Sequence, residues 1–182
     1  MKFAAAIIML AATGASIAAE EAKQPEKLKL EMVGVRVAYS ATRIDEDFAQ
    51  GEAYARLSLP KRWDFGRDWH IRLGLDMSAG MLGRLDEEDK GFIATLGPVF
   101  TLRSDRFPVD LVVGSSPTIM SRHTYDGVDF GIPFQFTSHI GFNAHLTRRW
   151  ALGYRFQHMS NASLSSHNPG LDMHSVSIGF KF

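Results

Sequence analysis

The chain has 182 residues, of which 45% are hydrophobic, and its 20 basic side chains balance 20 acidic ones. This composition fits one compact domain. It excludes a disordered chain and a strong electrostatic field for nucleic acid, so we expect no nucleic-acid partner. Because the chain has no cysteine, disulfides, thiolate metal sites and cysteine nucleophiles are also excluded.

The N-terminus predicts an export signal. Lys2 precedes an apolar run from Phe3 to Ala12, and small residues follow at Ser16 and Ala18. We therefore expect residues 1–19 to form a cleavable signal peptide. The alternative is an uncleaved membrane anchor, but the apolar run is short for a helix that spans a bilayer.

Eight segments follow in which apolar and polar residues alternate, and clusters of Gly, Asp, Asn, Ser and Pro separate them. Such a pattern is typical of strands and turns. In chain order, the apolar residues of the eight segments are Val33, Val35, Val37 and Tyr39; Ala53, Ala55, Leu57 and Leu59; Trp69, Ile71, Leu73, Leu75 and Met77; Phe92, Ala94, Leu96, Phe100 and Leu102; Val109, Leu111 and Val113; Phe134, Phe136, Ile140, Phe142 and Leu146; Trp150, Leu152, Tyr154 and Phe156; and Val176, Ile178, Phe180 and Phe182.

The alternation predicts an all-β fold, an eight-stranded antiparallel transmembrane β-barrel over residues 20–182 that belongs in an outer membrane. A soluble β-sandwich has the same period, but segments of about ten residues and an export signal favour the membrane. The chain also ends on Val-x-Ile-x-Phe-x-Phe, which resembles the carboxy-terminal assembly signal of outer-membrane proteins.

Polar side chains alternate with the apolar ones and predict a closed, side-chain-filled interior. An eight-stranded barrel is just wide enough for such side chains, so we expect no pore. The residues expected inside are Arg56, Arg72, Asp76, Asp110, Gln135, His139, Asn143, Arg155 and Gln157.

The connections between segments predict the orientation of the barrel, because outer-membrane barrels have short periplasmic turns and longer extracellular loops. The longer or more polar connections are Ser40 to Gly51, Gly80 to Gly91, Met120 to Pro133 and Asn161 to Leu171. They alternate with shorter ones. Both termini are therefore expected in the periplasm, and the hairpin between the last two strands should open at the outer leaflet.

A serine, a histidine and a carboxylate occupy outward positions near that hairpin. The outward register of the seventh segment continues to His158 and Ser160, and that of the eighth runs back to Asp172. Such groups are costly in a lipid-facing position unless they are paired. A serine activated by a histidine that a carboxylate orients is the arrangement for acyl transfer. The alternative is that the strand leaves the hydrocarbon at His158 and these residues face headgroups, since His-x-Ser alone is a weak motif.

The segment His158-Met159-Ser160-Asn161-Ala162, followed by Asn168-Pro169-Gly170-Leu171-Asp172, resembles the outer-membrane lipid A 3-O-deacylase family. The resemblance implies an eight-stranded barrel that hydrolyses the ester at the 3 position of lipid A. It assigns Ser160 as the nucleophile, His158 as the general base and Asp172 as the orienting carboxylate, with Asn161 in the oxyanion hole. Two residues depart from the family pattern: Asp172 stands where Glu is usual, and Ser163 where a glycine is expected.

The predicted function is therefore a serine esterase that acts on lipid A of lipopolysaccharide in the outer leaflet, with no cofactor and no metal. The lipid-facing aromatic residues Tyr154, Phe156, Phe134 and Phe136 are candidates for the groove of the departing acyl chain. Two alternatives remain: a non-enzymatic barrel for adhesion or membrane stabilisation, and a related phospholipid esterase or acyltransferase with the same triad. The sequence leaves open whether two copies form a homodimer.

Overall fold

The computed structural model describes residues 28–41, 47–86, 88 and 90–182. The predicted signal peptide, residues 1–19, lies outside the described residues. Within the described part, no helix is long and apolar enough to cross a membrane. The strands are β1 (Lys29–Ser40), β2 (Phe48–Phe65), β3 (Trp69–Arg84), β4 (Gly91–Ser104), β5 (Val109–Met120), β6 (Thr124–Tyr125), β7 (Val128–Asp129), β8 (Phe134–His145), β9 (Trp150–Ser160) and β10 (Leu171–Lys181).

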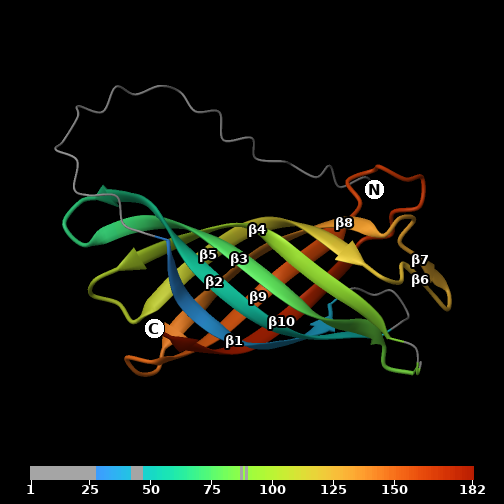
Figure 1. Cartoon of the computed structure of the whole chain (residues 1–182), viewed down its shortest axis with the longest axis horizontal. Coiled ribbons are helices and arrows are strands. Elements are labelled where there is room, and N and C mark those ends of the chain that lie inside the picture. Colours follow the sequence, from blue (N-terminus) through green and yellow to red (C-terminus); the bar gives the residue numbers. More distant parts are fainter. Residues whose placement is uncertain (1–27, 42–46, 87, 89) are drawn as a thin grey trace.

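Eight of these strands form a closed antiparallel barrel in the order β1-β10-β9-β8-β5-β4-β3-β2 (Figure 1). The first and last strands close it, with register partners from Met32 opposite Lys181 to Ser40 opposite Met173. Closure leaves no unpaired sheet edge, whereas a sandwich has edges on both sheets. The structure thus confirms the predicted barrel and excludes the sandwich.

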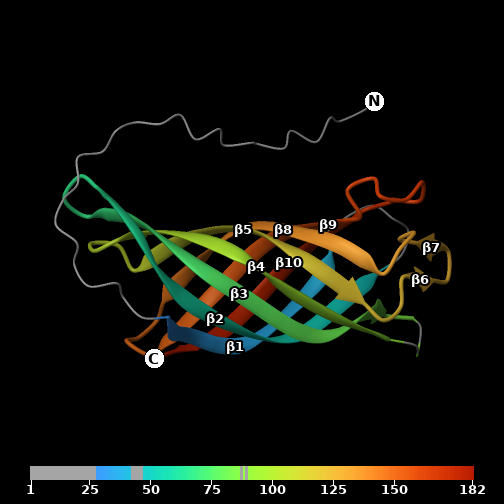
Figure 2. The same ribbon diagram turned by 45° about the horizontal axis from the view of Figure 1, so that its top comes forward.

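The barrel ends differ as the connections predicted. β1, β3, β5 and β9 all run toward one end, where β6 and β7 also lie, and we call this the loop end. The opposite end carries the turns 66–68, 105–108 and 146–149 together with Phe182, and we call it the turn end (Figure 2).

β2 and β3 are longer than the expected ten residues, with 18 and 16 residues. β2 runs on through Pro60, where its register with β3 shifts between Ser58 and Arg62. Proline cannot donate to a ladder, and an irregularity is where a strand tolerates it. At the loop end β2 begins at Phe48 and β3 ends at Arg84, so the loops expected from Ser40 to Gly51 and from Gly80 to Gly91 are shorter than predicted.

Charged side chains fill the middle of the barrel. Asp76 accepts contacts from Arg155 at 2.5 Å and Arg56 at 3.5 Å, and Arg36 pairs with Glu52 beside them. The cavity that this polar layer encloses measures only about 10 Å³, roughly the room for one water molecule. Of the residues expected inside, Arg72 alone is not buried among these described residues; it is half-buried near the turn end. The interior is therefore filled, as predicted.

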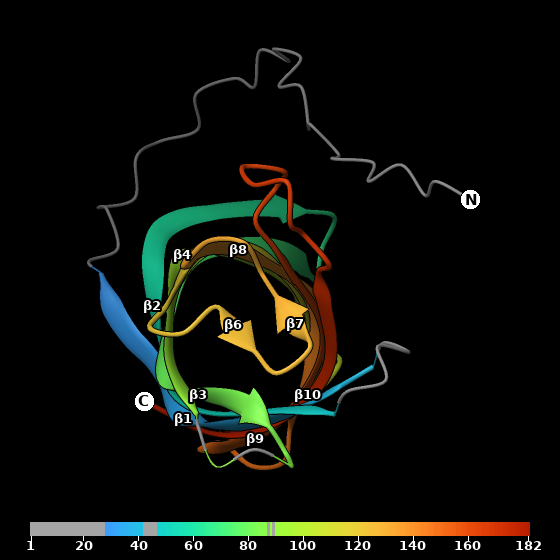
Figure 3. The ribbon, with the colours of Figure 1, turned by 90° about the vertical axis from the view of Figure 1, so that its right-hand side faces the viewer.

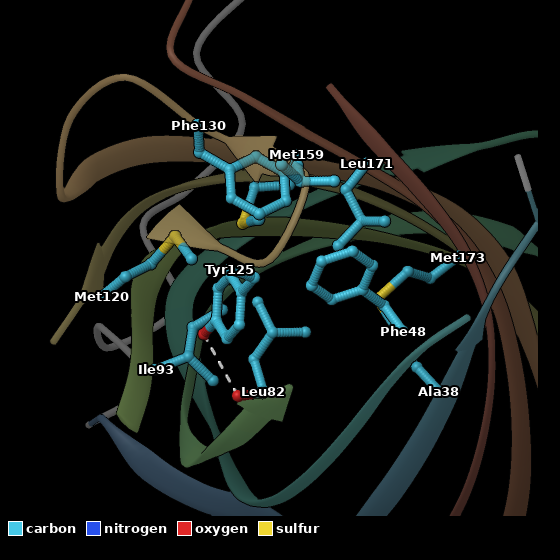
Figure 4. Packing of buried hydrophobic residues seen from close by; sticks show 11 residues of the cluster. Ala38, Phe48, Leu82, Ile93, Met120, Tyr125, Phe130, Met159, Leu171 and Met173 are labelled. Carbon is cyan, nitrogen blue, oxygen red and sulfur yellow. Dashed lines mark hydrogen bonds between the residues drawn. The ribbon is translucent and has the colours of Figure 1, made fainter. Parts of the chain in front are cut away.

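At the loop end a hydrophobic plug closes the barrel. β6 and β7 lie across the opening (Figure 3), and the rings of Tyr125 and Phe130 pack edge-on against Phe48 with centroids 5.3 and 5.7 Å away. The Tyr125 hydroxyl donates to the Leu82 carbonyl at 3.2 Å (Figure 4). The buried cluster comprises Ala38, Phe48, Leu82, Ile93, Met120, Tyr125, Val128, Phe130, Met159, Leu171 and Met173. Because the interior is blocked here, a site for a large amphiphilic ligand has to lie on the outer surface.

Candidate active site

The outer surface of β9 and β10 carries the predicted polar group. In β9 the odd-numbered residues are buried and the even-numbered ones face outward, which continues to His158 and Ser160 at its loop end. In β10 the same alternation turns Asp172 outward while Leu171 and Met173 are buried. All three predicted side chains thus lie on the outer face of two neighbouring strands.

His158 and Asp172 form a hydrogen-bonded pair. They are direct register partners between β9 and β10, and His158 Nδ1 lies 2.6 Å from Asp172 Oδ1. A carboxylate on Nδ1 holds the proton there and leaves Nε2 with its lone pair. The side chain of His158 is 50% exposed and that of Asp172 29%. Nε2 can therefore act as a base toward a group on the surface.

Gly170 lies against the imidazole of His158. This residue has a φ of 72°, and a Cβ added to it would lie 3.1 Å from His158 Cε1 and 3.9 Å from Nε2. The Cε1–Nε2 edge of the ring is therefore turned toward Gly170. Gly170 directly precedes Leu171, the register partner of Met159 in β9. A side chain at position 170 would therefore crowd the imidazole, and the glycine leaves room for it.

Ser160 is the last residue of β9, with Phe136 of β8 as its register partner. In the described part of the chain, its hydroxyl has no hydrogen-bond partner, so the contact between Ser160 and His158 is not formed. Contacts that mediate proton transfer often tighten only when substrate binds.

Asn161 differs from the expectation. Its side chain is fully buried, and the amide donates to the carbonyls of Phe130 at 3.0 Å and His167 at 2.7 Å. Its backbone N–H donates to Asn168 Oδ1 at 3.1 Å. With these donors engaged inside, Asn161 offers none to an oxyanion at Ser160. Its hydrogen bond to Phe130 instead holds the loop 161–170 against the plug.

The backbone after Asn161 takes an unusual course. Ala162 and Ser163 have φ values of 53° and 65°, in the left-handed region that favours glycine. Leu164 N–H closes the turn by donating to the Asn161 carbonyl at 3.0 Å. In the part of the loop that is described, the N–H groups of Ala162 and Ser163 have no hydrogen-bond partner. Ser163 thus occupies a position suited to the glycine that the resemblance leads us to expect.

Two of the predicted groove residues flank the serine on β8. Phe136 lies directly across from Ser160, and the ring of Phe134 packs edge-on against that of Phe136 with centroids 5.1 Å apart. Phe134 is 38% exposed and faces outward like Phe136. The surface beside Ser160 toward β8 is therefore aromatic.

The other two groove residues lie below His158, toward the turn end. Phe156 faces outward two residues away in β9, and its ring lies 5.6 Å from that of His174. The Tyr154 hydroxyl is 2.7 Å from His174 Nδ1, and these two rings stack. The structure therefore brings all four predicted aromatic residues to the outer surface around Ser160 and His158.

Gly170 and Asn168 are two positioning residues that the sequence analysis did not identify. Both belong to the Asn168-Pro169-Gly170 turn, and this residue combination is a recognisable turn signal. It gives no indication that the turn contacts His158 and Asn161, because these contacts depend on how the two strands pair.

Comparisons with known proteins agree on one family. A family model described as lipid A 3-O-deacylase (PagL) matches residues 49–181. The lipid A deacylase PagL of Bordetella bronchiseptica (strain ATCC BAA-588 / NCTC 13252 / RB50) is 29% identical over 142 residues, which cover 72% of this chain and 79% of the relative.

Solved structures share the fold. The crystal structure of the outer membrane enzyme PagL has a TM-score of 0.55 and 22% identity, and the match covers 82% of this chain and 99% of that one. The crystal structure of Neisserial surface protein A (NspA) has a TM-score of 0.52 and 11% identity, with 86% of this chain and 100% of that chain covered. This architecture is thus shared by an outer membrane enzyme and a surface protein, so the function has to be argued from the site.

Proposed function

We propose that this chain, which belongs to the lipid A 3-O-deacylase (PagL) family, is an outer-membrane esterase that releases the acyl chain from the 3 position of lipid A. The loop end is then the extracellular end, and the site faces the outer leaflet, where lipid A resides. The observation that carries the proposal is the His158–Asp172 pair, 2.6 Å apart on the outer face that also carries Ser160, two residues along β9.

In the reaction we propose, Ser160 Oγ attacks the ester carbonyl while His158 Nε2 accepts its proton. Asp172 holds the ring and stabilises the imidazolium that forms. The sugar oxygen leaves as a hydroxyl when His158 returns the proton to it, and an acyl-enzyme remains on Ser160. A water molecule, activated by His158 in the same way, then releases the fatty acid.

The oxyanion that forms on the carbonyl needs donors near Ser160, and Asn161 is not suited to this role. We propose the backbone N–H groups of Ala162 and Ser163, which directly follow it and are free of other partners in the described loop. Backbone donors of this kind are held in place before the reaction begins. Each is typically worth about 10²–10³ in rate.

The departing acyl chain is proposed to lie along the aromatic residues. Phe136 and Phe134 flank Ser160, and Phe156 and Tyr154 continue below His158 on the same outer face. An acyl chain on this surface stays in contact with apolar groups from the bilayer to the site, so the substrate does not have to leave the membrane.

The test is mass spectrometry of lipid A from cells that express the wild type, Ser160→Ala or His158→Ala. We expect loss of the 3-linked acyl chain with the wild type only. Heat-modifiable migration in detergent establishes that each variant is folded. A folded wild type that removes no acyl chain from lipid A would refute the activity, release of fatty acid from phospholipid alone would indicate a phospholipid esterase, and full activity of Ser160→Ala would refute the assigned nucleophile.

A further inference from the structure

A row of polar side chains crosses the outer surface at the level of His158. Ser115 of β5 is the register partner of Ser138 of β8, Ser138 is the partner of His158, and His158 is the partner of Asp172. Four neighbouring strands thus each contribute one outward polar residue at the same height. With strands about 4.8 Å apart, the row is about 14 Å wide.

The two serines of this row do not mark the edge of the membrane. Toward the loop end, the next outward residues are Pro117 on β5 and Phe136 on β8; toward the turn end, they are Val113 and Ile140. The serine pair is therefore enclosed by apolar residues above and below. At a membrane boundary, the outward residues between the serines and the water would instead be polar.

The two hydroxyls cannot satisfy each other completely. Ser115 Oγ and Ser138 Oγ are 3.0 Å apart, both side chains are exposed, and one hydrogen lies between the oxygens. The second hydroxyl hydrogen has no acceptor among the residues that the structure describes. Lipid tails offer none either, and an unpaired hydroxyl in an apolar environment costs free energy. The pair is thus a donor directed at the membrane, one strand away from the base.

We infer that the Ser115–Ser138 pair binds a second carbonyl oxygen of lipid A, that of an acyl chain attached beside the one that is cleaved. This inference rests on the proposed function. Lipid A carries several acyl chains, each joined through a carbonyl, so a substrate with its scissile ester at Ser160 brings further carbonyl oxygens to the same surface. The serine pair selects such a substrate over a lipid with a single acyl ester and orients it against His158.

The experiment compares two substrates in detergent, purified lipid A and the p-nitrophenyl ester of one long-chain fatty acid, which has only the scissile carbonyl. For the Ser115→Ala/Ser138→Ala double variant we expect kcat/KM on lipid A to fall about tenfold, mainly through KM, as for loss of one hydrogen bond. Hydrolysis of the single ester should change less than twofold. Ser138→Thr, which keeps the hydroxyl, should retain most of the activity on lipid A.

Val113→Ala/Ile140→Ala is the matched control, because it trims the adjacent outward pair on the same two strands and removes no hydrogen bond. We expect it to hydrolyse both substrates like the wild type. Unchanged kinetics of the serine variant on lipid A, or an equal loss on both substrates, would overturn the inference. A wild type that hydrolyses the simple ester but not lipid A would instead refute the proposed function, and the inference with it.

Discussion

Asp172 provides the clearest test of how the site works. Asp172→Asn keeps the size of the side chain but replaces the carboxylate that orients His158 Nδ1, so we expect deacylation to fall about 10³–10⁴-fold. Asp172→Glu, the residue usual in the family, should retain a substantial part of the activity. Rates on lipid A, measured on variants with unchanged heat-modifiable migration, check this expectation. An Asp172→Asn enzyme as fast as the wild type would show that the carboxylate has no catalytic part.

Asn161 should affect stability as well as rate. Asn161→Ala removes two hydrogen bonds from a buried side chain to the carbonyls of Phe130 and His167, and we expect a loss of about 2 kcal/mol in the unfolding free energy. Because the loop 161–170 is then released from the plug, activity should fall as well. Urea unfolding and deacylation are measured together. A lower rate with unchanged stability would point to a direct role at the oxyanion instead.

The period-two alternation explains which of these residues could be predicted. It correctly turned His158, Ser160 and Asp172 outward, because neighbours along a strand alternate between its two faces. One more step along the same alternation places Asn161 on the inner side, which is where its side chain lies. The alternation could not predict that His158 and Asp172 lie close together, because their distance depends on the register between two strands.

The loop that follows β9 has a strained backbone at Ser163, with a φ of 65°. Ser163→Gly should stabilise the protein by about 1 kcal/mol, because glycine adopts this conformation without the steric cost of a Cβ. Ser166→Gly is the matched control in the same loop: Ser166 has no positive φ, so the extra backbone freedom of glycine should destabilise it. The midpoints of urea unfolding of both variants are compared with that of the wild type. A Ser163→Gly protein less stable than the wild type would contradict the expected relief of backbone strain.

Strand positions followed well from the sequence, but strand lengths did not. The apolar sets marked each barrel strand, whereas β2 extends beyond its set at both ends and β3 beyond its set at the loop end. At the loop end, Gln50 and Glu52 continue the inward polar face while the outward residues are small, so hydropathy shows little contrast there. The pairing of the two strands, rather than their composition, sets where the hairpin ends.

The barrel as a whole depends on the charges that fill it. Asp76 contacts Arg155, Arg56 and Arg36 inside, so Asp76→Ala leaves buried cations without this partner and should cost about 3–5 kcal/mol. Asp68→Ala removes a surface pair with Arg106 and should cost less than about 1 kcal/mol. Urea unfolding in detergent measures both. Equal midpoints for the two variants would contradict a stabilising role for the interior network.

Composition and alternation were sufficient to predict an eight-stranded barrel, its filled interior and the outward face of the site, because all three follow from which side chains tolerate lipid. Contacts between residues distant in the chain required the folded structure: β6 and β7 over the opening, the Asn161 anchor, Gly170 against His158, and the Ser115–Ser138 pair. Register and loop packing produce these contacts. They join residues from separate strands and loops, and the order of apolar and polar residues along the chain does not specify which of these meet.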